Sequence, residues 1–456
     1  MGLQEREIWE YDQRIVPETW EFVALAVLLL ALLSFSFIYS QKKSIREPVY
    51  RFYMKGLIAK LFGSLVFCLI YLYYYGGGDT TSYFESSMAM AKLCYQSPSK
   101  YFEVLFNPPS PESHSLFTDK TGYPWSYLYA DSKTFMVVKL TSILTVLTGK
   151  SYFLTSVLLA YFSYLGIWKL FQLFQGYVPE IENKIAIAVL YFPSPLFWAG
   201  GVSKDTFTYT ASALFVYCAH QLFVKKDRTW MLAIFLFISA WIIISIKPYI
   251  FLVLFPGGLL WIFYDKMAKL RSKFLSIFLF PILILGVSFL SYFVLTQLGD
   301  NMSKFSIDNA LETAAITNYD LKQDYYGGSS FNIGDFDGSF GGMMSLFFPA
   351  MNAGMFRPYI WESRSIVLFI AGLENLFLLI FTLYILYKTK IIGTFRIILK
   401  NPLLLFCAIF TILFAFMIGL TTSNFGALVR FKIPILPFFV TTLFIIDYIM
   451  KKKKER

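Results

Sequence analysis

The sequence predicts an all-α fold, a polytopic membrane helical bundle, and three observations support this prediction. Of the 456 residues, 57% are hydrophobic and only 15% are charged, which leaves too little polar surface for a water-soluble chain of this length. The mean hydropathy is +0.58. The apolar residues gather into runs of about the length that crosses a bilayer, where helices satisfy every backbone polar group internally.

Apolar runs recur along the whole chain, and each is expected to form a helix. They lie near 20–40, 56–74, 134–148, 151–172, 184–199, 205–224, 229–246, 248–264, 274–296, 365–387, 402–421 and 433–450. Lys and Arg gather in short segments between these runs, and such segments face the cytoplasm. They lie at 42–55, 225–228, 266–273, 388–400 and 451–454.

The run at 134–148 interrupts the alternation of sides. The segment at 75–132 is rich in acids and is expected outside, so an odd number of crossings must separate it from the basic loop at 225–228. Four apolar runs lie between them. The run at 134–148 is short and contains Lys139, so we expect it to lie at the outer surface without crossing.

The predicted topology therefore has about 11 transmembrane helices plus short outer-face helices. The N-terminus is expected outside and the C-terminus in the cytoplasm of a bacterial-type inner membrane. Residues 1–456 are expected to form a single integral-membrane domain. Its first outer loop, with juxtamembrane helices, covers 75–150, and its large outer loop covers 297–364.

The charge and the cysteines argue against two other classes of protein. The formal net charge is +11, but most Lys and Arg lie between apolar runs, which indicates topology rather than nucleic-acid binding. Cys68, Cys218 and Cys407 fall inside apolar runs, so a structural disulfide is not expected. The segment Met1–Trp20 lacks the basic start of a cleaved signal peptide, so the first helix is expected to be retained.

The most informative motif is Gly76-Gly77-Gly78-Asp79 at the outer end of the run 56–74. A carboxylate at a membrane exit, on backbone with little bulk, is well placed to meet a substrate that arrives along the bilayer. Asp79 is therefore the candidate general base. Tyr83 and Glu85 follow on the same segment and are weaker candidates for substrate binding. The alternative interpretation of Asp79 is a turn residue.

Several cations are expected on the same outer face, against the positive-inside rule. Lys204, Lys247, Arg357 and Arg430 lie in short turns or beside Pro or Gly. Cations at an outer membrane mouth suit a phosphate or pyrophosphate group. The alternative is that these side chains only extend to the interface.

Asp205 is the second candidate catalytic carboxylate, and helix N-capping is its alternative role. Asp79 and Asp205 are also the candidates for holding a divalent cation, Mg²⁺ or Mn²⁺. Glu374 lies inside an apolar run, where an acid suits either a proton relay or a hydrogen-bonded packing role. The Gly-rich, aromatic loop at 297–364 suits either a mobile flap or a flexible linker.

Taken together, these motifs resemble the GT-C superfamily of integral-membrane glycosyltransferases. The shared features are an acid in the first outer loop (Asp79), a second outer turn with an acid (Asp205), and a basic residue before a Pro-containing last helix (Arg430). The resemblance implies an outward-facing site, a polyprenyl-phosphate sugar donor and a first-loop acid as base. It departs from the family in an extra preceding helix and in a lone Asp where paired acids are common.

The sequence thus predicts an enzyme of cell-envelope polysaccharide biosynthesis. It would move a hexosyl or pentosyl unit from a lipid donor to a glycan or lipid acceptor. An O-antigen-type polysaccharide polymerase or ligase is an alternative enzyme. A lipid-linked glycan flippase is an alternative from another class, which would place ionisable residues near the midplane of the membrane.

Overall fold

The computed structural model describes residues 15–268, 316, 319, 329–334 and 340–455. Within these residues the fold is all-helical, with a single isolated β-bridge between Ser330 and Asn424. The expected helix at 274–296 and most of the large outer loop lie outside the described residues. Contacts divide the chain into two compact units.

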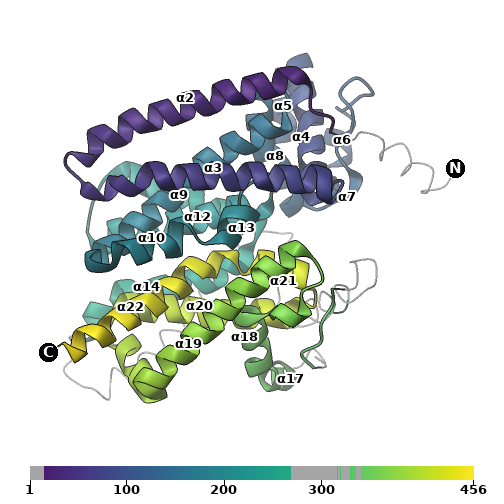
Figure 1. The fold of residues 1–456 in the computed structure, drawn as a ribbon. Coiled ribbons are helices and arrows are strands. Elements are labelled where there is room, and N and C mark those ends of the chain that lie inside the picture. Colours follow the sequence, from purple (N-terminus) through teal and green to yellow (C-terminus); the bar gives the residue numbers. More distant parts are fainter. Residues whose placement is uncertain (1–14, 269–315, 317–318, 320–328, 335–339, 456) are drawn as a thin grey trace. The chain divides into compact units, whose positions relative to one another are not determined.

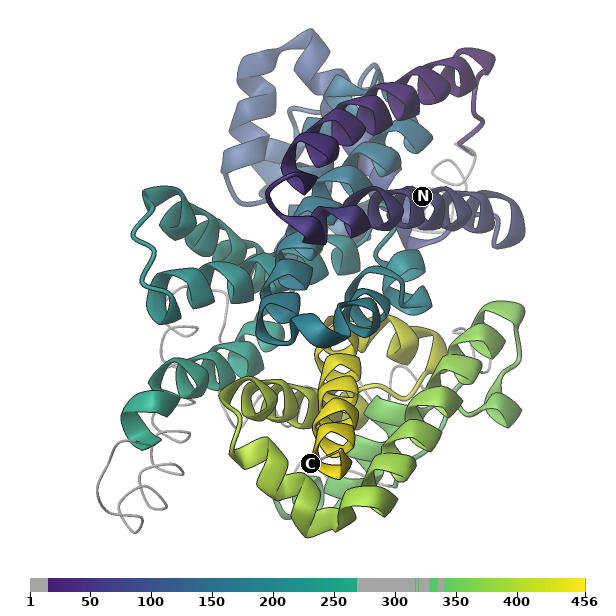
Figure 2. The same cartoon turned by 60° about the vertical axis from the view of Figure 1, so that its left-hand side comes forward.

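The first unit comprises residues 1–169, 195–211 and 245–247. It begins with a helical hairpin, α2 (Thr19–Ser44) and α3 (Tyr53–Leu69), drawn in purple in Figures 1 and 2. A π-helical turn, η2 (Ile70–Tyr74), extends α3. In the most apolar 18-residue stretch of α2, only 6% is buried inside the protein. Such exposure is expected of a helix that faces lipid.

A group of shorter helices follows the hairpin and fills the expected first outer loop. They are α4 (Asp79–Gln96), α5 (Pro98–Phe106), α6 (Pro111–His114), α7 (Ser126–Ala130) and α8 (Ser132–Leu147). The helices α4 and α8 pack together through buried hydroxyls, with Ser87 Oγ 2.8 Å from Thr145 Oγ1. The long helix α9 (Tyr152–Tyr177) and the start of α12 (Lys204–Ala219) complete this unit.

The second unit comprises residues 170–194, 212–244 and 248–456. Its long helices are α19 (Ile366–Leu399), α20 (Pro402–Thr421) and α22 (Leu436–Lys454). Shorter elements are α10 (Glu182–Leu190), η4 (His220–Val224), α13 (Trp230–Ile246), α14 (Pro248–Ala268), α17 (Phe340–Ser345), α18 (Phe347–Phe356), η7 (Ile360–Glu362) and α21 (Phe425–Phe431).

Two glycines set the close approach of α18 and α20 in this unit. A Cβ at Gly354 would lie 2.0 Å from Ala415 O, and one at Gly419 would lie 1.9 Å from Ala350 O. Membrane helices pack closely at such small residues, because lipid offers no hydrophobic drive for their association.

Six described helices are long and apolar enough to span a membrane. They cover 19–44, 48–74, 152–177, 366–399, 402–421 and 425–453, which confirms six of the expected runs. The count of about 11 is not confirmed. The helices at 230–246 and 248–264 are apolar but shorter, and α8 is short, as expected.

Two runs differ from their expected form. The run at 184–199 divides into α10 and α11 (Pro193–Trp198), because Pro193 has no N–H to continue the first helix. The basic segment at 388–400 was expected to be a loop, but α19 continues through it with a break at Lys390 (φ 58°, ψ 161°). Lys and Arg are good helix formers, so their charge marks a side of the membrane without ending the helix.

Candidate functional site

The glycine run holds Asp79 at the start of α4. The N–H of Gly77 donates to Tyr71 O at 2.8 Å, and the Gly78 N–H donates to Thr81 Oγ1 at 3.0 Å. Thr81 Oγ1 in turn donates to Gly78 O at 2.8 Å. Asp79 is exposed in the first turn of α4, where the positive end of the helix dipole favours a carboxylate.

Gly78→Ala should both destabilise the protein and displace Asp79. Gly78 has φ 141° and ψ −166°, a conformation that is essentially confined to glycine, and a Cβ would lie 3.1 Å from Tyr71 Cε1. We expect a loss of about 1–3 kcal/mol, read as a lower melting temperature in detergent.

Gly176→Ala is the control for this change, because Gly176 lies in α9 with open space around it. An equal melting temperature for Gly78→Ala and wild type would contradict the account of the turn.

A second carboxylate, Asp131, lies at the start of α8. Its Oδ1 accepts from the Lys133 N–H at 3.1 Å, and its Oδ2 accepts from Thr134 Oγ1. Lys204 Nζ donates to the same Thr134 hydroxyl and lies 3.9 Å from Asp131 Oδ2. The N-terminal ends of α8 and α12 therefore meet through this cation.

The charges of several candidate residues act on the ammonium group of Lys204. Burial lowers the pKa of Lys204, and the positive charge of Lys247 adds to that effect, while the negative charges of Asp131, Asp79 and Asp205 oppose it. Burial raises the pKa of Asp131, but the Thr134 hydrogen bond and the charge of Lys204 outweigh it and hold the pKa below its usual value. Lys204 is thus paired with Asp131 and is also within reach of the charges of Asp79, Asp205 and Lys247.

Asp205 and Lys247 form a buried ion pair beside this cluster. Lys247 Nζ lies 2.5 Å from Asp205 Oδ1, and the two side chains are only 6% and 1% exposed. Burial of this degree keeps Asp205 away from an incoming substrate. The pair instead joins the first turn of α12 to the residue that precedes α14.

The turn that carries Lys204 is held against α3. Lys60 is fully buried in α3, and its Nζ donates to Ala199 O at 2.5 Å. The packing at two glycines leaves no room for a side chain: a Cβ at Gly63 would lie 2.5 Å from Leu196 O, and one at Gly201 would lie 2.4 Å from Phe67 Cδ1. Sequence reasoning missed Lys60, although a lysine inside an apolar run is a signal of function or of a specific partner.

Glu85 and Tyr83, the weaker candidates, lie in the body of α4. Tyr83 is only 4% exposed, so little of its side chain is accessible. Glu85 Oε2 accepts from Trp125 Nε1 at 2.7 Å. Burial raises the pKa of Glu85 to about 7, and the Trp125 hydrogen bond lowers it only in part.

The raised pKa predicts that stability falls as the pH rises. Between the ordinary pKa of 4.5 and about 7, the folded chain keeps a proton that the unfolded chain has released, so the free energy of unfolding decreases across this window. After allowance for solvent screening, the change is on the order of 2 kcal/mol.

Glu85→Gln should flatten this dependence, measured as melting temperature at pH 5 and at pH 8. Glu103→Gln, an exposed change in the neighbouring helix α5, should keep the wild-type slope. An unchanged slope for Glu85→Gln would contradict the assignment.

The other predicted cations belong to the second unit. Arg357 donates from Nε to Glu362 Oε1 at 3.0 Å, and its guanidinium lies 4.4 Å from the Phe331 ring centroid and 5.1 Å from that of Phe425. The Arg357 side chain is therefore engaged by one carboxylate and by two aromatic rings. Arg430 is partly buried in α21.

Glu374 is hydrogen-bonded to Ser194, through the backbone N–H at 2.7 Å and through the hydroxyl. Its sequence neighbour Asn375 accepts from Lys432 Nζ, which also donates to Arg357 O at 3.1 Å. Glu374 thus has an internal partner, and the network adds Lys432 as a buried basic residue.

The structure therefore pairs Lys204 with Asp131 and Lys247 with Asp205 in the first unit, where the charge of Asp79 also acts on Lys204. Sequence reasoning missed Asp131. The signal was present, because Asp131-Ser132-Lys133-Thr134 precedes an apolar run and has the pattern of a helix N-cap. Among the described residues, no group of three or more His, Cys, Asp or Glu side chains could hold a metal ion.

Comparison of the chain with protein-family models, with curated proteins and with solved structures found no match.

Proposed function

We propose that the protein is a membrane glycosyltransferase that uses a polyprenyl-phosphate sugar. Its site would lie in the first unit, at Asp79, Asp131 and Lys204. One observation supports this proposal most directly: the exposed Asp79 and the cation of Lys204 belong to one electrostatic group built from the N-terminal ends of α4, α8 and α12. A base beside an anion-binding cation is what transfer from a lipid phosphate needs.

The proposed reaction is a single displacement at the anomeric carbon. Asp79 accepts the proton of the acceptor hydroxyl while that oxygen forms the new glycosidic bond. The bond between the anomeric carbon and the phosphate oxygen breaks, and its electron pair leaves with the lipid phosphate. Lys204 stabilises the charge that develops on that oxygen, aided by the positive ends of the helix dipoles.

The remaining first-unit residues position this pair. Asp131 and Thr134 hold the Lys204 ammonium, and the Asp205–Lys247 pair fixes the turn on which Lys204 lies. Arg357, engaged by Glu362 and two aromatic rings, is assigned to packing within the second unit. Arg430 also belongs to the second unit, and this proposal gives it no role.

The resemblance to the GT-C superfamily supports two further features of this proposal, the side of the membrane and the class of acceptor. The site faces outward from a bacterial-type inner membrane, and the acceptor is a glycan or a lipid. A divalent cation is not assigned a step, because the described carboxylates do not form a ligand set for it.

The experiment is donor consumption by purified full-length protein. Labelled polyprenyl-phosphate and polyprenyl-diphosphate sugars are supplied separately with an acceptor pool from cell-envelope extract. Consumption of the monophosphate donor with transfer of label supports the proposal. Consumption of only the diphosphate donor would overturn it in favour of the polymerase or ligase.

A lipid-linked glycan flippase is a second candidate, favoured by buried ionisable groups inside apolar helices. Lys60 lies in α3, and Glu374 lies in α19 beside Asn375, the partner of Lys432. Such groups are typical of transport pathways as well as of enzymes. Movement of a labelled lipid-linked glycan across proteoliposomes, without transfer of its sugar, would favour this function.

A further inference from the structure

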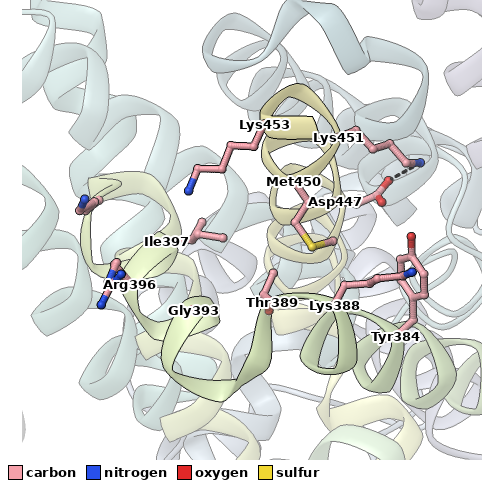
Figure 3. A pocket seen from close by; sticks show the side chains of 11 residues that line it. Tyr384, Lys388, Thr389, Gly393, Arg396, Ile397, Asp447, Met450, Lys451 and Lys453 are labelled. Atoms are coloured by element: carbon pink, nitrogen blue, oxygen red, sulfur yellow. Dashed lines mark hydrogen bonds and ion pairs between the residues drawn. The ribbon is translucent and has the colours of Figure 1, made fainter. Parts of the chain in front are cut away.

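A separate cavity lies in the second unit, between the last turns of α19 and the C-terminal turns of α22 (Figure 3). It encloses about 580 Å³, within the range of ligand-binding pockets. None of the residues that line it belongs to the site proposed above.

The break in α19 creates this cavity. At Lys390 the backbone leaves the helical region, with φ 58° and ψ 161°, so that the two parts of α19 take different directions. The hydroxyl of Thr394 donates to Lys390 O at 3.0 Å and contacts Thr389 Oγ1, which fastens the break from within. Lys388 comes from one side of the break and Arg396 from the other, and both line the cavity.

The lining carries a large excess of positive charge. It contains five cations, Lys388, Arg396, Lys400, Lys451 and Lys453, against the single carboxylate of Asp447. Asp447 Oδ2 is already paired, with Lys184 Nζ at 2.8 Å and Lys451 Nζ at 3.1 Å. Figure 3 shows Lys453 of α22 extending toward the turn that carries Arg396 and Ile397. Cations gathered in this way repel one another unless an anion lies among them.

The surroundings of the cavity are apolar. Tyr384, Ile397 and Met450 contribute apolar surface to its lining, beside Thr389 and Gly393. On the same stretch of α19, Ile392 is 74% exposed and Phe395 is 59% exposed. Both α19 and α22 belong to segments long and apolar enough to span a membrane, and the cavity lies at their ends. A ligand that fits must therefore combine an anionic head with apolar chains.

We propose that this cavity binds the phosphate headgroup of an anionic membrane phospholipid, with its acyl chains along the exposed apolar face of α19. The Arg396 guanidinium offers a two-pronged fit to phosphate oxygens, and the lysines neutralise the remaining charge. Basic pockets between membrane helices bind acidic headgroups in this manner. The lipid is distinct from the sugar donor, and the proposal does not depend on the proposed function.

The test is binding of phosphatidylglycerol to the purified full-length protein in a neutral detergent, followed through the rise in melting temperature. The triple variant Lys388→Gln, Arg396→Gln, Lys453→Gln should weaken the apparent affinity roughly 10- to 100-fold. The control variant Lys225→Gln, Lys226→Gln, Arg228→Gln removes the same number of exposed charges from another basic loop and should respond as wild type does.

Two further probes separate the sources of phosphate. Phosphatidylcholine and inorganic phosphate, each at the same phosphate concentration, should leave the melting temperature of the wild-type protein nearly unchanged. An equal response to inorganic phosphate would overturn the assignment to a lipid. An unaltered response of the first triple variant to phosphatidylglycerol would overturn the assignment to this cavity.

Discussion

Asp79→Asn should abolish sugar transfer while leaving the protein folded. The amide keeps the size of the carboxyl group but cannot accept the acceptor's proton at neutral pH, so a loss on the order of 10²–10⁴-fold in the transfer rate is expected. Because Asp79 is exposed in the first turn of α4, the change removes little packing. The measurement is transfer of label from a polyprenyl-phosphate sugar, with the melting temperature recorded in parallel.

Asp119→Asn is the matched control for this variant. Asp119 is another exposed acid of the first unit, and its described contact is a hydrogen bond from Tyr123 at 3.2 Å. It should transfer sugar at the wild-type rate. Near-normal transfer by Asp79→Asn would return Asp79 to the role of a turn residue.

Lys247→Met should cause the largest loss of stability. The change removes the cation that faces Asp205 Oδ1 at 2.5 Å while the carboxylate stays buried, and breaking one side of a buried pair costs about 3–5 kcal/mol. The melting temperature of the full-length protein in detergent reports the effect.

Two controls separate charge from packing at this pair. The double variant Asp205→Asn, Lys247→Met removes both charges and should recover much of the loss. Lys184→Met breaks a pair whose lysine is 36% exposed and whose Asp447 also has Lys451, so it should cost much less. A double variant that is no more stable than Lys247→Met would contradict the account.

The helical class and the position of the main spans could be predicted from the sequence because the bilayer imposes length and apolarity on each run. The turn at Asp79 could also be predicted, since three consecutive glycines favour unusual backbone angles. The break between α10 and α11 was within reach, because Pro193 lies inside the expected run. The number of membrane crossings could not be predicted in this way, because it depends on which loops are assigned to each side by their charge. It also includes residues outside the described part of the chain.

The partners within the site could not be predicted, because they come from segments distant in sequence. Lys204 meets Thr134 across 70 positions of chain, and Lys60 meets Ala199 across 139. Composition alone cannot distinguish a lysine at an interface from one that is buried against a carbonyl. The same limit applied to Asp205, whose buried pairing with Lys247 joins residues 42 positions apart.

The most direct test of the central claim is a double-mutant cycle on Asp79 and Lys204. Single-turnover transfer is measured for wild type, Asp79→Asn, Lys204→Gln and the double variant. Residues that serve one transition state are strongly non-additive, so the double variant should transfer about as slowly as the worse single variant. Losses that multiply in the double variant, or wild-type transfer by Lys204→Gln, would contradict a shared site.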